Sequence, residues 1–412
     1  MTIKTLLPER SGAKSKAYYC VPSTSSGNKD IFLQSQFEIV GALVLLAGTA
    51  ILFLAALAAA GFFGSTSGGL EKKRSVATTS EFQSPLTGLP INAAIADRRA
   101  LAVMIDNHLD SRPPSGLEAA DLIWEVPVEG GITRFLAVFQ SQDAERIGPV
   151  RSARVYFIDW VRELDAVFAH VGGHHEALRR LRAEDRDIAD ADAFRAGGTF
   201  WRAASRDAPH STYTTTERLR ALIESRGWIP LEADRPPSMV SSGWSNHKAV
   251  VAVPSAGRPL TGWSASSTIP AWRFGEASGE PVETVSIGWG SPLFSVRYTY
   301  DSKSHVWSRE LAGAPHRLSD GSELTTTNIA VMFVKVLGRP EPGTGTLTIE
   351  TMGEGEALVF SGGKLTQGVW KKPTPAARTK FYKENGEEVV FRPGATWIEV
   401  VPSTLREGVT WE

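Results

Sequence analysis

Arginine side chains gather beside a predicted helix start in the first half of this 412-residue sequence. The segment GPVRSAR places Arg151 and Arg154 three residues apart, a spacing that puts both on one face of a helix. A helix N-terminus attracts anions through its free N–H groups and its dipole, and arginine adds bidentate pairing with phosphate or carboxylate. The pattern therefore indicates a site for an anionic ligand. The alternative is that these arginines form structural ion pairs with nearby acids, namely Glu125, Glu129, Glu163 and Asp165.

Histidines are concentrated in the same region, which holds five of the eight in the chain: His108, His170, His174, His175 and His210. Together with Asp106, Glu125 and Glu129 they offer ligands for a metal ion. Their spacing matches no strong metal motif such as HExxH. We therefore expect surface or hydrogen-bonding roles for them and no metal or other cofactor, with a bound divalent cation as the alternative. Ser152 and Ser211 lack the G-x-S-x-G context, which argues against a serine hydrolase.

The predicted ligand site combines residues that follow a strand or precede a helix. Parallel neighbouring strands bring such residues to a common edge of the sheet, where ligands of α/β proteins bind. Gly172 and Gly173 can form a backbone nest for an anion, or a plain turn. The sequence leaves open which face of the sheet Arg134 points to. The full set comprises Asp106, Asn107, His108, Arg134, Arg151, Arg154, His170, Gly172, Gly173, His174, Arg202 and His210.

Strands and helices alternate over residues 85–230 and must position this site. Apolar runs predict strands at Leu101–Ile105, Leu122–Val128, Ile132–Phe139 and Ala166–Val171. Apolar residues at helical spacing follow Arg154, and a second helix is expected from about Glu176. Thr214–Arg226 reads as a third helix, capped by Thr215 or Thr216 and ended by Gly227. We expect an α/β (α+β) domain with a mixed sheet.

The last region, residues 251–404, changes to short alternating runs separated by turn signals such as SDG, PGTG and ENG. This pattern predicts a mainly antiparallel β domain. A linker is expected at 231–250 and a short C-terminal tail at 405–412. The expected strands lie at Phe294–Tyr300, Ile329–Val336, Thr346–Glu350, Ala357–Phe360 and Trp397–Val401.

One long apolar segment predicts that the chain is anchored in a membrane. Ile39–Phe63 contains 25 residues without a charge, more than the roughly 20 that a helix needs to cross a bilayer. Five basic residues precede this segment, and three follow it at Lys72, Lys73 and Arg74, which favours an N-terminus on the cytoplasmic side. We expect a disordered cytoplasmic tail at 1–38, one transmembrane helix at 39–63 and a flexible tether at 64–84. The bulk of the chain would then be extracytoplasmic; a cleaved signal peptide is the alternative.

Net charge and cysteine content limit the kinds of partner and covalent link that this chain can have. A formal net charge of −1 gives no electrostatic support for a nucleic-acid partner. Cys20 is the one cysteine, so the chain can form no internal disulfide. Because Cys20 precedes the apolar segment, it also cannot be the lipidated cysteine of a cleaved lipoprotein.

Several long motifs resemble the YerB-like family of bacterial envelope lipoproteins, whose biochemical function is unknown. In the N-terminal half the resemblance rests on PLTGLP, AVMIDNHLDSRPPSGLEAADLIWE, VEGGITRFLAVFQ, IGPVRSAR, AHVGG and APHSTY. In the C-terminal half it rests on VWKKPTPAARTKFY and GATWIEVVP. The resemblance covers roughly residues 85–404. The chain departs from the lipoprotein pattern because no cysteine follows its apolar segment.

A weaker resemblance is to the LytR-CpsA-Psr phosphotransferases, which share the plan of a short inside tail, one span and an outer α/β domain. The resemblance would place Arg151 at a lipid pyrophosphate, but Ser152 stands where that family has an acidic residue beside the arginine. In that reading Asp106 or Asp121 would hold a cation and His170 would be a base.

Two classes of function follow. The first is a non-catalytic envelope protein that binds an anionic ligand, such as a cell-envelope glycan or a polyprenyl phosphate, or an envelope protein partner. The second is a phosphotransferase acting on polyprenyl-pyrophosphate-linked glycan. We favour the first class because the acidic cluster that holds magnesium in the phosphotransferases is incomplete here.

Overall fold

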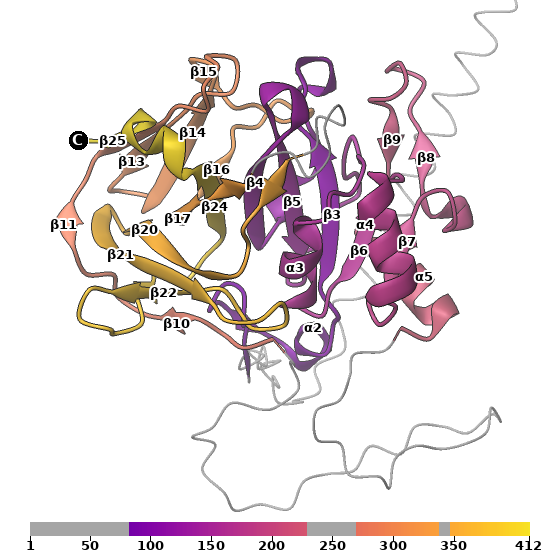
Figure 1. Ribbon diagram of the computed structural model, residues 1–412, viewed down its shortest axis with the longest axis horizontal. Coiled ribbons are helices and arrows are strands. Elements are labelled where there is room, and N and C mark those ends of the chain that lie inside the picture. The colour runs from indigo at the N-terminus through magenta and orange to yellow at the C-terminus, as the bar shows by residue number, and fades with distance from the viewer. Residues whose placement is uncertain (1–81, 229–268, 338–346) are drawn as a thin grey trace, which may run out of the picture. The chain divides into compact units, whose positions relative to one another are not determined.

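An eleven-stranded mixed sheet takes strands from both halves of the sequence (Figure 1). The structure, a computed structural model, describes residues 82–228, 269–337 and 347–412. Along the sheet the strands follow the order β11-β21-β20-β17-β24-β4-β5-β3-β6-β7, and β22 pairs with β21. Their bounds are β3 Leu101–Asp106, β4 Leu122–Val128, β5 Ile132–Phe139, β6 Val167–His170, β7 Asp190–Asp192, β11 Glu280–Pro281, β17 Asn328–Val334, β20 Gly353–Ser361, β21 Lys364–Lys372, β22 Lys380–Lys383 and β24 Thr396–Pro402.

A hairpin at the centre of the sheet joins β4 and β5. Both strands have the bounds that their apolar runs predict, and all but two of their residues are buried. Gly130 and Gly131 turn the chain with φ of 80° and 71°, a region that only glycine adopts at little cost. β3 pairs with the far side of β5 and runs parallel to β4 and β6, so these strands end at the same edge.

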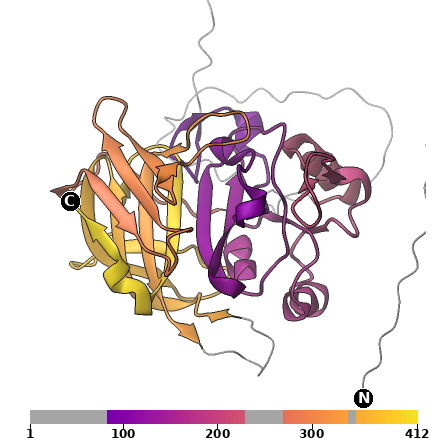
Figure 2. The ribbon, with the colours of Figure 1, turned by 90° about the horizontal axis from the view of Figure 1, so that it is seen from above.

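The two regions of the sequence share this sheet through β24. This strand pairs in parallel with β4 on one side and with β17 on the other. Figure 2 accordingly shows the orange and yellow strands of the C-terminal half beside the purple strands of the N-terminal half. The described residues thus form one compact unit.

Short helices cover one face of the sheet. They are α3 (Phe157–Arg162) and α4 (His175–Arg179), which continues as a π-helical turn at Arg180–Glu184. Phe157 and Trp160 of α3 pack in one apolar core with Met104 of β3 and Leu136 of β5. Burial of these large side chains, worth roughly 1.5–3 kcal/mol each, holds α3 against the sheet.

A second sheet of six strands covers the other face. Its strands are β12 (Thr284–Ile287), β13 (Val296–Asp301), β14 (Val306–Leu311), β15 (Ala314–Pro315), β16 (Thr325–Thr326) and β25 (Val409–Trp411). Val285, Tyr298 and Trp307 share a core with Val103 of β3 and with Leu219 of helix α5 (Thr216–Arg226). Alternate residues of β3 therefore enter the two cores on opposite faces, as the period of a strand requires.

The remaining elements are short and lie at the margins. They are α2 (Ala93–Ala96), the pair β1 (Phe82–Gln83) and β2 (Pro90–Ile91), the pair β8 (Trp201–Arg202) and β9 (Thr212–Tyr213), the pair β10 (Arg273–Phe274) and β23 (Val390–Phe391), and the pair β18 (Val336–Leu337) and β19 (Thr348–Ile349).

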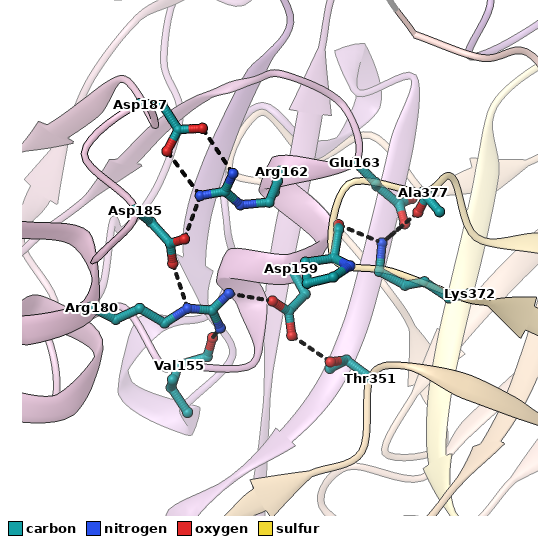
Figure 3. A network of polar contacts seen from close by, with 11 residues as sticks. Val155, Asp159, Arg162, Glu163, Arg180, Asp185, Asp187, Thr351, Lys372 and Ala377 are labelled. Carbon is teal, nitrogen blue, oxygen red and sulfur yellow. Dashed lines mark hydrogen bonds and ion pairs between the residues drawn. The ribbon is translucent and has the colours of Figure 1, made fainter. Parts of the chain in front are cut away.

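Ion pairs tie α3 to both halves of the chain (Figure 3). Asp159 of α3 accepts a hydrogen bond of 2.6 Å from Arg180 and another from Thr351 of the C-terminal half. Glu163, which directly follows α3, accepts a hydrogen bond of 2.8 Å from Lys372 of β21. Both carboxylates are buried. These polar contacts therefore hold α3 in place in addition to its apolar packing.

The expected fold is confirmed in its coarse form, a mixed sheet with helices in the N-terminal region and antiparallel-rich strands in the C-terminal region. Beyond residue 269 the described residues form strands and turns, with a single 3-10 stretch at Ser403–Gly408. The expected tail at 405–412 is wrong, because Val409–Trp411 pairs with β12 as an edge strand of the second sheet. The expected tether at 64–84 also ends too late, because Phe82–Gln83 already pairs with Pro90–Ile91.

The predicted cytoplasmic tail, the apolar segment at 39–63, most of the tether and the linker at 231–250 lie outside the described residues. Within the described ranges, the helices are all too short or too polar to cross a membrane.

Candidate functional site

The GPVRSAR segment lies at the edge where β3 and β6 end. Its backbone bonds to both strand ends: Arg151 N–H donates to Met104 O at 2.9 Å, and Arg151 O accepts from Val171 N–H at 3.0 Å. Helix α3 begins only at Phe157 and has six residues. The expectation that Arg151 and Arg154 share a helix face is therefore wrong, because both side chains leave the backbone before the helix starts.

Asp106 is the centre of a polar cluster at this edge. Its side chain is fully buried at the end of β3, and Oδ2 lies 2.6 Å from His210 Nδ1 and 3.0 Å from Arg151 Nε. Oδ1 accepts from the backbone N–H of His108 at 3.3 Å. A buried carboxylate needs such partners, because burial without them would neutralise it. Sequence reasoning chose these four residues but did not predict that Asp106 would pair with His210.

Two histidine rings stack beside Asp106. The rings of His108 and His210 lie 4.9 Å apart at 15°, and His108 Nδ1 is 3.4 Å from a carboxylate oxygen of Asp110. One ligand atom from each of His108, Asp110 and His210 lies within 4.8 Å of the others. These side chains could hold a metal ion. Asp110 was missed by the sequence analysis, although the His-x-Asp spacing after a buried strand was a usable signal.

Arg134 is buried on the helix-covered face and lies opposite Asp106 in the β3–β5 register. Its NH1 donates to Ser152 O at 2.9 Å, while its Nε has no hydrogen-bond partner among the described residues. Burial, followed by repulsion from Arg154, lowers the pKa of Arg134 to about 10. The guanidinium thus stays charged at neutral pH, and no described carboxylate lies within ion-pair distance of it.

Arg154 forms the structural ion pair that was the alternative prediction. Its Nε contacts both oxygens of Glu129 at 2.8 and 2.9 Å, and both side chains are mostly buried. The turn that carries Glu129 follows β4, so the pair closes the space between that turn and the segment before α3. Among the described residues, Asp106 is the carboxylate that pairs with Arg151, and Arg151 NH1 reaches Pro209 O at 3.4 Å.

His170 and the glycine turn are structural. The buried His170 ring contacts Gly172 O at 2.7 Å through Nδ1 and Asp190 at 2.8 Å through Nε2. Both ring nitrogens are therefore occupied, and the expectation that His170 is a base is wrong. The N–H of Gly172 donates to Asp192 at 2.9 Å, which removes it from an anion nest. The backbone of this turn bonds to the arginine segment through Gly172 O and His174 N–H with Ala153. Burial, followed by the charges of His175 and Arg154, lowers the pKa of the His174 ring.

Three further expected residues lie away from the cluster. Asn107 points between the two sheets, where its side chain donates to Thr133 at 2.8 Å. Arg202 of β8 contacts Ser211 at 3.4 Å on the exposed margin. Asp121 precedes β4 at the opposite edge of the sheet and accepts from the N–H groups of Gln140 and Ser141. Gln140 and Ser141 thus occupy both oxygens of Asp121, which cannot act together with Asp106 from the opposite edge.

Two cavities flank the Asp106 cluster. The larger, of about 750 Å³, is lined on the cluster side by Asp110, His210 and Arg206. The other, of about 500 Å³, lies between His108 and Trp289 of the C-terminal half. Sequence reasoning could not find Trp289, because only the packing of the second sheet brings it to this edge.

Comparisons with known proteins cover most of the chain. The profile described as "Protein of unknown function (DUF3048) N-terminal domain" matches residues 86–229, and its C-terminal counterpart matches residues 285–398. "Putative lipoprotein YerB" of Bacillus subtilis (strain 168) is 30% identical over 326 residues, which are 79% of this chain and 88% of the relative. The crystal structure of YerB protein from Bacillus subtilis is similar with a TM-score of 0.65 at 27% identity, covering 81% of this chain and all of that chain.

Proposed function

This chain belongs to the YerB-like family, and on that premise we propose that it is a membrane-anchored envelope protein whose edge arginines bind an anionic ligand. The ligand class is a phosphate- or carboxylate-bearing molecule of the cell envelope. The observation that carries the proposal is the buried guanidinium of Arg134, which has no carboxylate partner among the described residues.

The envelope location is supported by the relative and by the sequence. The relative is described as a putative lipoprotein, and this chain carries an uncharged 25-residue segment at Ile39–Phe63. Because Cys20 precedes that segment, a transmembrane helix replaces a lipid as the anchor. Protease treatment of intact cells stripped of their wall should remove residues 85–412. If this part of the chain remains protected, the proposed orientation is wrong.

The local balance of charged side chains supports anion binding at the sheet edge where β3 and β6 end. Three guanidinium groups, those of Arg134, Arg151 and Arg154, face two carboxylates, those of Asp106 and Glu129, which leaves one positive charge in excess. An unpaired buried charge costs several kcal/mol, and a bound anion would relieve that cost. The partly exposed Arg151, whose side chain is 22% accessible, offers the entry to this positive region.

Guanidinium groups also define the ligand class. Their planar N–H forks match the oxygens of phosphate and carboxylate, and each charge-assisted hydrogen bond contributes about 1.5–3 kcal/mol. Binding of this kind requires no catalytic group. The phosphotransferase alternative gains no support from the geometry, because His170 has both ring nitrogens occupied and Asp121 lies at the far edge.

Calorimetric titration of the full-length protein in detergent with pyrophosphate, and separately with citrate, tests the proposal. We expect saturable binding of at least one of the two at low salt. Arg151→Ala should weaken it about tenfold or more, the equivalent of one charge-assisted hydrogen bond. Arg151→Lys should also weaken it, because lysine lacks the bidentate fork.

Arg317→Ala is the matched control, since Arg317 is an exposed arginine that pairs with Glu323 in a hairpin loop of the second sheet. It should leave the affinity unchanged. The proposal is overturned if neither anion binds, or if Arg151→Ala and Arg317→Ala bind equally well. It is also overturned if Arg151→Ala unfolds the protein while Arg151→Lys binds as tightly as the wild type, because Arg151 would then be a structural ion-pair residue.

A further inference from the structure

We propose that His108, Asp110 and His210 form a binding site for one divalent transition-metal ion, with Asp106 as the residue that orients His210. One potential ligand atom of each of the first three residues lies within 4.8 Å of the others. In a tetrahedral zinc site with ligands at about 2.0–2.1 Å, the ligand atoms lie roughly 3.4 Å from one another. The three side chains must therefore close by on the order of one ångström to bind the ion, and Asp110 can move because its side chain is 74% exposed.

Asp106 supplies the second observation that points to a metal. Metal-binding histidines usually donate their other ring N–H to a carboxylate, which fixes the tautomer and raises the basicity of the ligand nitrogen. His210 Nδ1 contacts the fully buried Asp106 Oδ2 at 2.6 Å, so a proton on Nδ1 leaves Nε2 as an acceptor. The carboxylate–histidine arrangement of a metal centre is thus already formed.

The loops that carry the ligands are held to one another. Arg206 of the loop before His210 donates to Asp110 O at 2.9 Å and to Pro113 O at 2.7 Å. The stacking of the His108 and His210 rings adds a direct contact between the two loops. A metal ion therefore meets ligands whose relative positions are largely set, which lowers the entropic cost of binding it.

The donor set selects the class of ion. Two imidazoles and one carboxylate suit Zn²⁺ and the neighbouring first-row divalent ions. Mg²⁺ and Ca²⁺ prefer sites built from oxygen ligands. Three protein ligands also leave a coordination position open, and His210 and Asp110 both line the cavity of about 750 Å³. A water molecule or a small ligand can reach the ion from there.

The test uses full-length protein freed of metal by a chelator, titrated with Zn²⁺ by calorimetry and with Co²⁺ by visible absorption. We expect one ion per chain, and the absorption bands of cobalt in a nitrogen-containing site of low coordination number. His108→Ala, His210→Ala and Asp110→Asn should each weaken Zn²⁺ binding at least tenfold. Asp106→Asn should weaken it about 10–100-fold, the usual effect of losing an orienting carboxylate.

His175→Ala is the control, because His175 is an exposed histidine beside His174 and lies outside the proposed ligand set. It should bind Zn²⁺ as the wild type does. Asp110→Asn and His108→Ala keep the test decisive if the Asp106 and His210 variants misfold, since Asp110 and His108 are more exposed. The proposal is overturned if no stoichiometric ion binds, if Mg²⁺ competes equally, or if Asp110→Asn and His108→Ala match His175→Ala. Neither pyrophosphate nor citrate is present in these titrations, so failure of the metal proposal and failure of the anion proposal are distinguishable.

Discussion

Glu399 of β24 lies directly opposite Glu125 of β4 in a parallel register, and both carboxylates are fully buried. Arg309 of the second sheet forms an ion pair with Glu125 and lies 3.9 Å from Glu399. Tyr298 donates a hydrogen bond of 2.6 Å to Glu399. Burial, and next the charge of Glu125, raise the pKa of Glu399 well above its usual value. Glu399 therefore holds a proton more readily than an ordinary glutamate does, and Glu125 is the direct ion-pair partner of Arg309.

The first prediction is that amide substitutions at these two carboxyl groups differ in cost. Glu125→Gln should lower the free energy of unfolding by about 3–5 kcal/mol, because it leaves Arg309 buried without a counter-charge. Glu399→Gln leaves the close ion pair of Arg309 with Glu125 in place and should cost less than about 1.5 kcal/mol. Denaturant titration of the two variants at pH 7 measures the difference. Equal costs would show that the proton is not on Glu399.

The second prediction concerns pH. An unfolded glutamate has a pKa of about 4.3, whereas that of folded Glu399 is raised, so above about pH 4.3 the unfolded state binds fewer protons. The contribution of Glu399 is complete below that pH and declines as pH rises toward the folded pKa. Between pH 5 and 8, Glu399→Gln should therefore gain stability relative to the wild type, by up to roughly 1.4 kcal/mol per pH unit. A constant difference across this range would contradict the raised pKa.

The third prediction concerns Glu163, whose carboxylate is fully buried and accepts from Lys372 at 2.8 Å and from Arg378 at 2.6 Å. Glu163→Ala removes the carboxylate that both buried cations contact and should cost at least about 3 kcal/mol. The exposed pair Arg317–Glu323 provides the control, since Glu323→Ala should cost less than about 1 kcal/mol. Thermal unfolding of both variants compares them, and similar losses would mean that the buried contact adds nothing.

The fourth prediction concerns the N-terminus of α5. Thr215 accepts a hydrogen bond of 2.9 Å from the N–H of Arg218. Thr215→Ala should lower the free energy of unfolding by about 1 kcal/mol, because this N–H loses its partner. Thr215→Ser keeps the hydroxyl and should retain most of the stability. If both variants lose the same amount in denaturant titration, the cap is not the cause.

Local signals in the sequence determined the elements near the centre of the sheet. The apolar runs of β4 and β5, separated by Glu129 and two glycines, predicted both strands with their bounds. The threonines at 215 and 216 and Gly227 likewise predicted where α5 begins and ends, because capping residues act within one turn of the helix. The helix start near Arg151 was placed too early, since Pro149 and the bonds of this segment to β3 keep it extended.

The sequence by itself also determined that the polar residues at the end of β3 lie at a sheet edge, because residues that end a buried strand must lie there. Only the tertiary structure decided what each of them contacts. The pairing of Asp106 with His210, and the insertion of β24 beside β4, join segments far apart in the chain. Such contacts depend on the order of strands and the packing of loops, whose free energies come from many small burial terms spread over the whole fold. No local pattern of residues encodes that sum, so the arrangement of the site emerges only when both sheets are packed.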